Sequence, residues 1–195
     1  MSDGKCLVEE CTNKTLARGL CNKHYKQQRA SGELALLPKL TLHERFWAKV
    51  DKTGDCWNWT AATLDSGYGV FTAATDIGAS QLVHRFAFEQ LVGEIPDGRE
   101  IDHRCHNRRC VNPKHLRVVT HKQNQENRAG AQRTSISGIR GIYWLEKRQR
   151  WCARVKHNGR YHSAGWHHTR EAAEAAVIAK RNELFSHNDK DRAAS

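Results

Sequence analysis

Apolar and polar residues alternate in three short runs between residues 138 and 168. GIYWLE and WCARVKH flank the polar stretch KRQR, and RYHSAGW follows the dipeptide Asn158-Gly159. A period of two is typical of half-buried strands, and Asn-Gly is typical of a two-residue hairpin turn. The pattern therefore predicts three short strands in this part of the chain.

A helical pattern follows over residues 170–185. Thr169 stands at the N-cap position, and apolar residues recur at the spacing of one helix face. These residues are small enough to let the helix lie close on a sheet, and we expect the tail from Ser186 to fray. The face consists of Ala173, Ala176, Val177 and Leu184.

The middle of the chain, residues 56–128, mixes strand and helix patterns. The runs CWNWTAA and GYGVFTA predict strands, and HRFAFEQLV predicts a helix that ends at Gly93. A strand is expected to end at His103, and LRVVT predicts another. Thr120 and Gln123 then form a capping box for the helix that follows.

These patterns predict an α+β protein of several small modules rather than one large core. The N-terminal pattern predicts a small knuckle followed by a short basic helix at residues 24–29. One amphipathic turn is expected at residues 42–50. Modules of this size usually need a metal to be stable. The expected division is a small finger at 1–32, a connector at 33–55, a central module at 56–128, a linker at 129–136, a sheet-and-helix module at 137–185 and a tail at 186–195.

Positive charge is concentrated near the predicted strands. The 195 residues carry a net charge of +11, and residues 130–170 hold nine Lys or Arg but one acidic residue, Glu146. With Trp and Tyr interleaved, this region favours a polyanion partner, although a solvated basic face would have the same charge. No run approaches the roughly eighteen apolar residues of a membrane span, and the N-terminus lacks the apolar region of a signal peptide. We therefore expect a cytoplasmic protein with no membrane partner.

Seven cysteines, an odd number, do not suit a closed disulfide framework. With nearby histidines, six of them form two sets at metal-ligand spacing, and zinc prefers a tetrahedron of thiolates and imidazoles. The alternative is that these cysteines are reduced and simply buried. The seventh, Cys152, is expected to be a packed strand residue. The first zinc set is Cys6, Cys11, Cys21 and His24, and the second is Cys56, Cys105, Cys110 and His115.

The segment IDHRCHNRRCVNPKHLRVVTHKQN joins the second zinc set to residue types that hydrolyse phosphodiesters. Asp102 and His103 end a strand, and Asn124 lies in the first turn of a helix, so the metal-pinned loop between them can bring the three together. Carboxylate and amide oxygens suit Mg²⁺ or Mn²⁺, and an imidazole can take a proton from water. The segment predicts a one-metal phosphodiesterase site, although His103 alone would also suit a structural role.

A longer series of residues repeats a known pattern in both type and spacing. The series is Cys56-Trp57-x-Trp59, Gly67-Tyr68-Gly69, His84-Arg85, Ile95-Pro96-x-Gly98, Asp102-His103-x-Cys105, Cys110-x-Asn112-Pro113-x-His115-Leu116 and Asn124. In these residues the segment 56–128 resembles the HNH, or ββα-metal, nuclease superfamily. It looks most like phage-type HNH endonucleases and the His-Cys box homing endonucleases.

The resemblance assigns roles to individual residues. It implies that His103 is the general base and that Asn124 holds the catalytic metal. In the HNH branch it also implies a second metal ligand at Asp102. It implies that Arg85 approaches the scissile phosphate. The alternative is that Arg85 is an ordinary surface arginine. His115 stands where HNH motifs often carry asparagine, and its place in the zinc set favours the His-Cys box branch.

Residues 137–185 carry a second pattern: Ser137-Gly138-Ile139-Arg140-Gly141-Ile142-Tyr143-Trp144, Arg150-Trp151-x-Ala153-Arg154-Val155, Gly165-Trp166 and Thr169-Arg170-Glu171-Ala172-Ala173. They resemble the AP2 DNA-binding domain, whose three-stranded sheet packs on one helix and enters the major groove. Trp151 suits either the groove or the core. The resemblance implies DNA contacts by Arg140, Trp144, Arg148, Arg150, Arg154, Lys156 and Trp166.

The first zinc set, within CLVEECTNKTLARGLCNKHY, resembles a small zinc finger seen ahead of phage HNH domains. Lys23, Lys26 and Arg29 follow its ligands. They either add phosphate contacts or form an ordinary solvated helix face.

Together these patterns predict a phage or bacterial endonuclease that cuts preferred sites in double-stranded DNA. It would use one Mg²⁺ or Mn²⁺ and two structural zinc ions. One alternative is a DNA-binding regulator with an inactive, nuclease-derived fold, which would need to have lost the base or a metal ligand. The other is an RNA-binding zinc protein, against which the AP2-like sheet argues. Homodimer formation, nicking or double-strand cleavage, and a role in homing, packaging or defence stay open.

Overall fold

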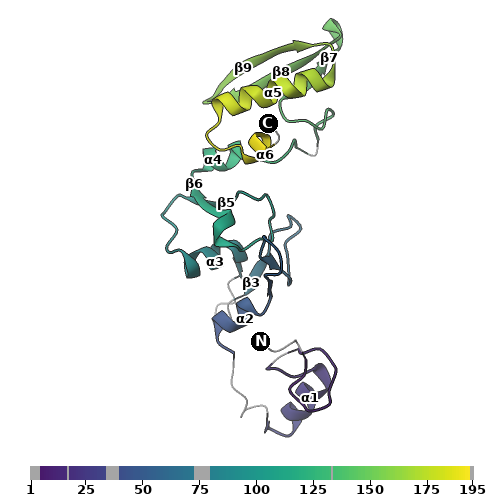
Figure 1. The fold of residues 1–195 in the computed structure, drawn as a ribbon, viewed down its shortest axis with the longest axis vertical. Helices are drawn as coiled ribbons and strands as arrows, with labels where there is room; N and C mark the ends of the chain where they lie inside the picture. The colour runs from purple at the N-terminus through teal and green to yellow at the C-terminus, as the bar shows by residue number, and fades with distance from the viewer. Residues whose placement is uncertain (1–4, 17, 34–39, 73–79, 133, 194–195) are drawn as a thin grey trace. The chain divides into compact units, whose positions relative to one another are not determined.

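The computed structural model describes residues 5–16, 18–33, 40–72, 80–132 and 134–193. The protein is a mixed α+β structure of small sheets and short helices (Figure 1). The described residues up to Val50 belong to one compact unit, and nearly all the rest belong to a second, larger unit. The expected connector and linker fall in part on residues 34–39 and 133, which lie outside the described residues, as do residues 194–195 of the tail. Within the described ranges, no helix has the length and apolar character that crossing a bilayer requires.

The N-terminal unit begins with a knuckle around a very small core. Cys6, Leu20 and Cys21 are buried, and Tyr25 packs against them. Its helices are α1 (Asn22–Ala30), which contains the predicted basic helix, and α2 (Leu42–Trp47), which begins with a capping box between Thr41 and Glu44. So small a core cannot stabilise a module by burial alone, which makes the cysteine and histidine side chains around it important.

The central part of the larger unit starts with short strands and one helix. Gly69 lies so close to its neighbours that an added Cβ would be 2.6 Å from Val83 Cγ2 and 2.8 Å from Trp59 Cδ1. Trp59 and Val83 are almost fully buried, so the glycine allows this core to close. The elements are β1 (Val50–Asp51) paired with β2 (Asn58–Trp59), β3 (Val70–Thr72) paired with β4 (Ser80–Leu82), and α3 (Val83–Leu91).

A β-hairpin and a short helix follow. Strand β5 (Glu100–His103) pairs antiparallel with β6 (Leu116–Val119), so that Asp102 lies opposite Arg117. A single 3₁₀ turn, η2 (Pro113–His115), lies in the loop between the two strands. Helix α4 (His121–Glu126) follows β6, and the predicted capping box of Thr120 and Gln123 is confirmed.

The C-terminal module is a three-stranded antiparallel sheet covered by one helix, as predicted. Asn158 and Gly159 both have positive φ, at 50° and 77°, which is the turn that the Asn-Gly pair predicts. An added Cβ on Gly141 would lie 2.5 Å from the Arg154 carbonyl oxygen, so glycine lets the chain enter the sheet there. The elements are β7 (Ile142–Leu145), η3 (Glu146–Arg148), β8 (Arg150–His157), β9 (Arg160–His167) and α5 (Arg170–Leu184).

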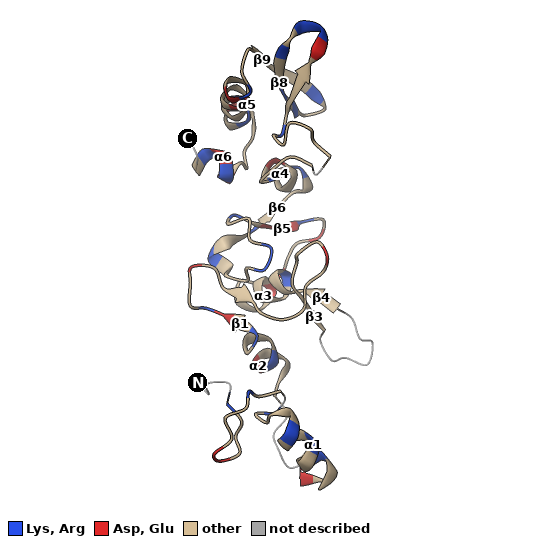
Figure 2. Cartoon of the chain, turned by 90° about the vertical axis from the view of Figure 1, so that its right-hand side faces the viewer, with Lys and Arg blue, Asp and Glu red and all other residues tan. Residues whose placement is uncertain are grey.

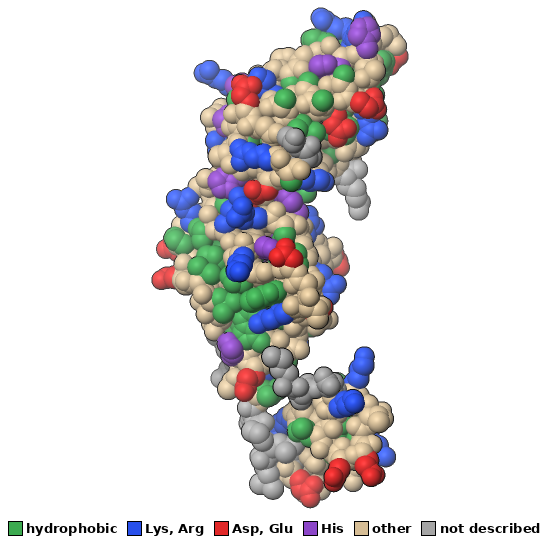
Figure 3. Space-filling view, viewed as in Figure 1, with side chains coloured by type: hydrophobic (Ala, Val, Ile, Leu, Met, Phe, Trp, Pro, Cys, Tyr) green, Lys and Arg blue, Asp and Glu red, His purple; other side chains and the backbone are tan. Residues whose placement is uncertain are grey.

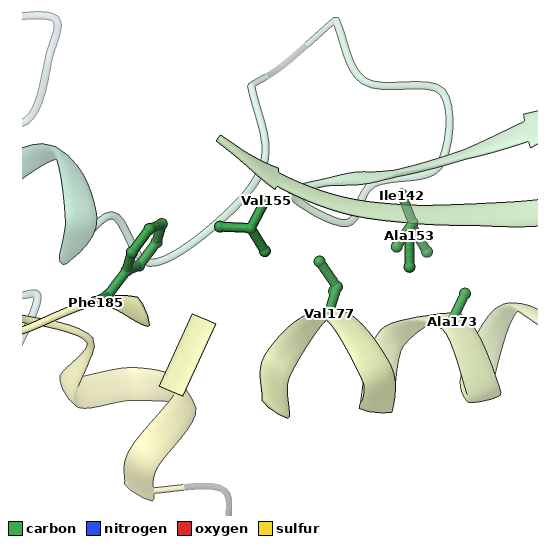
Figure 4. Packing of buried hydrophobic residues seen from close by; sticks show 6 residues of the cluster. All are labelled: Ile142, Ala153, Val155, Ala173, Val177 and Phe185. Carbon is green, nitrogen blue, oxygen red and sulfur yellow. The ribbon is translucent and has the colours of Figure 1, made fainter. Parts of the chain in front are cut away.

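Small side chains bring α5 close to the sheet, as the sequence predicts. Figure 4 shows Ala173 and Val177 of the helix pointing toward Ala153 and Val155 of β8, with Phe185 closing the end of the cluster. Thr169 Oγ1 accepts a hydrogen bond from the Ala172 N–H, as its N-cap position predicts. Trp151, which suited groove or core, packs against this core cluster.

Residues 186–193 are ordered, so the prediction of a frayed tail was wrong for the described part of the tail. It folds into α6 (Asp189–Ala193), and the side chain of Asn188 just before it is buried. Figures 1 and 2 both show α6 beside α4, and Ser186 donates two hydrogen bonds to Glu126 of α4. Polar composition near a chain end suggested fraying, but specific partners in distant parts of the chain fix this segment.

Candidate functional site

The β5–β6 hairpin and α4 form one side of a polar cleft of about 220 Å³. Asp102, His103 and Asn124, the three residues singled out in the sequence, all line it. The remaining lining residues are Ile101 of β5, two residues of the loop after β5, residues 127–131 after α4, and Tyr68. The fold therefore brings together a carboxylate, an imidazole and an amide that are up to 22 positions apart in the sequence.

His103 has a defined tautomer. Its ring is buried, with 5% of the residue exposed, and Nε2 lies 3.1 Å from the Cys110 carbonyl oxygen. Because a carbonyl can only accept, Nε2 must carry the proton, and Nδ1 keeps a free lone pair. Burial lowers the pKa of His103 below its ordinary value, more than the Cys110 carbonyl raises it. The side chain is thus neutral near pH 7 and can accept a proton at Nδ1.

A second histidine, His84, packs against the ring of His103. The rings of His84 and His103 meet edge to face with centroids 4.7 Å apart, and Tyr68 lies within 6.0 Å of both. Burial, with help from the charges of His103 and Arg85, lowers the pKa of His84 to about 3. His84 therefore stays neutral and adds no charge beside His103. In the sequence, His84 was identified only as part of the motif His84-Arg85, and its contact with His103 was not predicted.

Asp102 is tightly engaged by protein groups. Its Oδ2 accepts hydrogen bonds from Arg117 Nε at 2.9 Å and Nη2 at 2.8 Å. Asn127 Nδ2 donates to the same carboxylate at 2.9 Å. The carboxylate is buried with its charge paired, as buried charges must be. Sequence reasoning missed Arg117 and Asn127, although Arg117 lies at the register position opposite Asp102.

Asn124 is oriented by a residue that sequence reasoning also missed. Its Nδ2 donates to Glu100 Oε2 at 2.5 Å, and His121 Nδ1 lies 2.7 Å from Glu100 Oε1. These contacts, that of Asn124 first, lower the pKa of Glu100, so its carboxylate only accepts. The amide must then turn its nitrogen to Glu100 and leave Oδ1 available as a hard ligand atom.

The structure places Arg85 differently from the three central residues. It lies on α3 beside His84 and, among the residues that the structure describes, does not line the cleft. Arg108 lines it instead, with its guanidinium 5.3 Å from the centre of the Tyr68 ring and Nη1 donating to the Ser66 carbonyl. The sequence predicted only that Arg108 lies in the metal-pinned loop after His103, and its position over Tyr68 was not predicted.

The second cysteine set converges as the spacing predicts. Hydrogen bonds from Val111 N to Trp57 O and from Trp59 N to Arg109 O bring the segment with Cys56 alongside the loop after β5. The pKa of Cys105 is lowered to about 5, first by its contact with Cys110, so one thiolate forms readily. The ligand atoms of Cys56, Cys105, Cys110 and His115 all lie within 4.8 Å of one another and could hold a metal ion.

The distances fit a tetrahedral ion. Zinc bonds of about 2.3 Å to sulfur and about 2.0 Å to nitrogen place neighbouring ligand atoms about 3.5 to 3.8 Å apart. Cys56 Sγ and Cys110 Sγ each lie 3.5 Å from His115 Nδ1. His115 Nε2 contacts Asp55 Oδ2 at 3.2 Å, and a carboxylate on the far nitrogen is the usual support of a metal-bound histidine. Asp55 was not predicted from the sequence.

The first set has the same geometry within its own unit. Its four ligand atoms also lie within 4.8 Å of one another. Cys6 Sγ is 3.3 Å and Cys21 Sγ 3.5 Å from His24 Nδ1, and Cys11 Sγ is 3.9 Å from Cys21 Sγ. The Cys21 N–H also donates to Cys6 Sγ at 3.3 Å. Both sets can therefore hold zinc. The first set consists of Cys6, Cys11, Cys21 and His24.

The sheet of the C-terminal module has one face covered by α5 and one open face. Arg154 lies on the open face between Tyr143 and Tyr161, 4.8 Å and 4.3 Å from their ring centres. Arg148 stacks over Trp166 at 4.8 Å. Basic residues colour β8 and the turn before it in Figure 2, whereas Figure 3 shows acidic and basic side chains mixed around α5. The open face is therefore cationic and aromatic.

Two of the seven expected DNA-contacting residues lie elsewhere. Trp144 pairs across the strands with Trp151, and the two rings make an edge-to-face contact on the face that carries the core. Arg140 donates to the carbonyls of Glu126 and Arg128 at the end of α4, both at 3.0 Å. Burial lowers the pKa of Arg140 to about 10. The open face holds Arg148, Arg150, Arg154, Lys156 and Trp166, to which the structure adds Tyr143 and Tyr161.

Comparison with known proteins finds a nuclease family model that matches the segment carrying Asp102, His103 and Asn124. The HNH endonuclease family model matches residues 81–126, from β4 to the end of α4. Protein 7.7 of Escherichia phage T7 is 37% identical over 73 residues, which make up 37% of this chain and 54% of the relative. Protein 2.8 of the same phage is 31% identical over 86 residues, 44% of this chain and 58% of the relative.

An uncharacterized gene 5.3 protein of Enterobacteria phage T3 is 53% identical over 38 residues, 20% of this chain and 38% of the relative. The chain spans about half the length of the two T7 relatives. No solved structure matches it significantly. The family match supports a nuclease, and the relatives show that similar sequences occur in phages.

Proposed function

We propose that this protein is a metal-dependent DNA endonuclease of the HNH or His-Cys box type. The observation that carries the proposal is the hydrogen bond from His103 Nε2 to the Cys110 carbonyl. It leaves Nδ1 as a proton acceptor in the same polar cleft as Asn124, inside the segment that matches the HNH endonuclease family model. The proposal therefore rests on a proton acceptor and an amide ligand that line the same cleft.

In this proposal His103 takes the proton of the attacking water at Nδ1. Asn124 Oδ1 and Asp102 would hold a Mg²⁺ or Mn²⁺ ion, which, when bound, neutralises charge on the phosphate and the leaving oxygen. Asn124 is ready for this role because Glu100 takes its amide nitrogen. Asp102 would have to share its carboxylate with Arg117, and Arg108 is better placed than Arg85 to approach the phosphate.

The two cysteine-histidine sets are proposed as structural zinc sites. The ligand distances support this, and closed sets of four protein ligands leave no position for a substrate. The second ion would pin the loop between β5 and β6, whose Cys110 carbonyl orients His103. The first would stabilise the finger, whose own core is too small.

The open sheet face is the proposed DNA-binding surface of the C-terminal module. Arginines stacked on aromatic rings keep their N–H groups available for phosphates and base edges. The AP2-like assignment rests on the sequence resemblance and on the observed sheet and helix.

A plasmid nicking assay tests the proposed function. Supercoiled plasmid is incubated with zinc-loaded protein, with and without Mg²⁺ or Mn²⁺, and the nicked and linear forms are measured. We expect cleavage with added metal and none with a chelator that leaves the structural zinc in place.

The second candidate is a DNA-binding protein with an inactive nuclease fold. It is favoured by one observation, that Asp102 is fully engaged by Arg117 and Asn127. Tight binding to the plasmid with no cleavage under any metal would support this candidate and contradict the nuclease.

A further inference from the structure

The segment after α5 contacts both the sheet module and the hairpin that lines the cleft. One of its carboxylates binds each of these two parts. Asp191 of α6 accepts a hydrogen bond from Arg181 of α5 at 2.6 Å. Asp189 of the same helix forms an ion pair with Arg117 of β6, the arginine that also holds Asp102. Five residues of helix thus reach the sheet module on one side and the strand of the cleft on the other.

The connection to the cleft has two parallel branches. In the first, Arg117 bridges Asp102 and Asp189. In the second, Asn127 donates from Nδ2 to Asp102 at 2.9 Å and accepts at Oδ1 from the Asp189 N–H, also at 2.9 Å. Arg117 and Asn127 therefore each contact both Asp102 and Asp189, and these four residues form a closed network. Such a network fixes geometry better than a single contact, because no member can rotate without breaking bonds.

Further contacts hold the same junction around α4. Glu126 accepts from the backbone N–H and the hydroxyl of Ser186, both at 3.0 Å. Arg140, just before β7, donates to carbonyls at the end of α4, and its own carbonyl accepts from the buried Arg181. Arg140 thus has a linking role, which explains why it lies away from the open face.

We propose that residues 186–193 act as a latch that fixes the sheet module against the hairpin carrying Asp102 and His103. The position at which the sheet binds DNA then determines which phosphate reaches the cleft. Asp189 and Asn127 are positioning residues for cut-site choice. This inference rests on the proposed function, because it assumes that the cleft cuts and the sheet binds.

Asp189→Asn is the sharpest variant. It keeps the side-chain shape and the backbone N–H that donates to Asn127, but it removes the negative charge and one of the two oxygens that accept from Arg117. Glu183→Gln on α5 is the matched control, because it removes the same charge from an exposed carboxylate that pairs with Lys180. Ser186→Ala is a milder second variant, which takes away one hydroxyl donor to Glu126.

Hydrogen exchange of the full-length, zinc-loaded protein tests the latch without any activity. Losing a hydrogen bond to a charged group should increase exchange of the amides of residues 187–193 by about ten- to hundredfold. The control should exchange like the wild type, and Ser186→Ala should lie between the two. Equal protection of this segment in Asp189→Asn and wild-type protein would overturn the latch.

Cleavage mapping tests its function. A linear fragment carrying the strongest cut site of the wild-type protein is footprinted and its cut ends are sequenced. The wild type should cut at one fixed distance from the footprint. Asp189→Asn should bind within about twofold of wild-type affinity, since the open face is unchanged, but its cuts should spread over neighbouring phosphates.

The two failures are distinguishable. A wild-type protein that cuts no DNA contradicts the proposed function, whatever the exchange data show. A wild type that cuts, together with an Asp189→Asn protein that opens the latch and still cuts at the same phosphate, overturns the role in cut-site choice. Loss of DNA binding in Asp189→Asn would also overturn it, because the segment would then serve the binding module alone.

Discussion

One backbone carbonyl sets the chemistry of His103. Because Cys110 O holds Nε2, the proton-accepting nitrogen is Nδ1, and the side chain has no part in either cysteine-histidine set. His103→Ala should therefore abolish cleavage, with a loss of about 10²- to 10⁴-fold, while zinc content, circular dichroism and DNA binding stay near those of the wild type. The measurement is the initial rate of plasmid nicking.

Adding Mg²⁺ or imidazole to the assay distinguishes the loss of a general base from the loss of a metal ligand. Raising Mg²⁺ should not restore the His103→Ala protein, whereas added imidazole should restore part of the rate, because the missing group is a proton acceptor. His168→Ala, an exposed histidine ahead of α5, is the control and should cleave normally. Wild-type rates in a folded His103→Ala protein would rule out the mechanism, and loss of zinc in that variant would show a structural role.

Asn124 depends on Glu100 for the direction of its amide. Glu100→Gln can donate as well as accept, so the Asn124 amide would be free to turn its nitrogen into the cleft. We expect this substitution to lower activity by about 10- to 100-fold, as loss of a supporting residue around a metal commonly does.

Asn124→Ala should do more damage, and the Mg²⁺ concentration at half-maximal rate should rise in both variants. Titration of the nicking rate with Mg²⁺ measures this, with Glu94→Gln, an exposed carboxylate, as the matched control. An unchanged Mg²⁺ requirement in Asn124→Ala would show that the amide does not bind the catalytic ion.

At the scale of elements, the loop between β5 and β6 has one fully buried apolar side chain, Val111, and we propose that zinc at its cysteine-histidine set holds the rest of it. Cys110→Ala should leave Cys105 and His115 without a full ligand set, and the binding energy of zinc is folding energy for such a segment. We expect the wild type to carry about two zinc ions per chain and the variant about one, with loss of helical and strand signal.

Metal analysis and circular dichroism of purified protein measure both effects. Cys152→Ala is the control, since Cys152 is buried in the sheet outside both sets and should leave the zinc content unchanged. Folded, active wild-type protein with no zinc, or with one ion, would contradict the ligand assignment.

The elements that local chemistry specifies were predictable. Period-two alternation predicts the strands β7 to β9, the Asn158-Gly159 turn has the expected positive φ values, and the capping box at Thr120 begins α4 as expected. The latch was not predictable, because its contacts join positions such as Arg117 and Asp189 that no local period relates. The same holds within the site: His103 and Asn124 follow from spacing, whereas Glu100, Asp55 and Arg108 gain meaning only from the folded backbone.

At the scale of the whole molecule, affinity for DNA should come mainly from the open sheet face. Each cation that neutralises a phosphate releases counterions, so the logarithm of the association constant should fall linearly with the logarithm of salt concentration. Deleting residues 130–195 removes this face together with the latch. We expect the truncated protein to bind DNA weakly, with a shallower salt dependence than the full chain.

Single substitutions on opposite sides of the sheet module distinguish DNA binding by the open face from attraction by the net charge of the protein. Arg154→Ala removes a cation from the open face, where two tyrosines hold it, whereas Lys180→Ala removes one from α5 on the covered side. Both variants lower the net charge equally, so bulk attraction to DNA predicts equal effects. The open-face proposal instead predicts that Arg154→Ala lowers the salt slope by about 1 while Lys180→Ala leaves it unchanged. Fluorescence anisotropy of a labelled duplex over a range of salt concentrations measures both slopes, and equal slopes would contradict the assignment of this face to DNA.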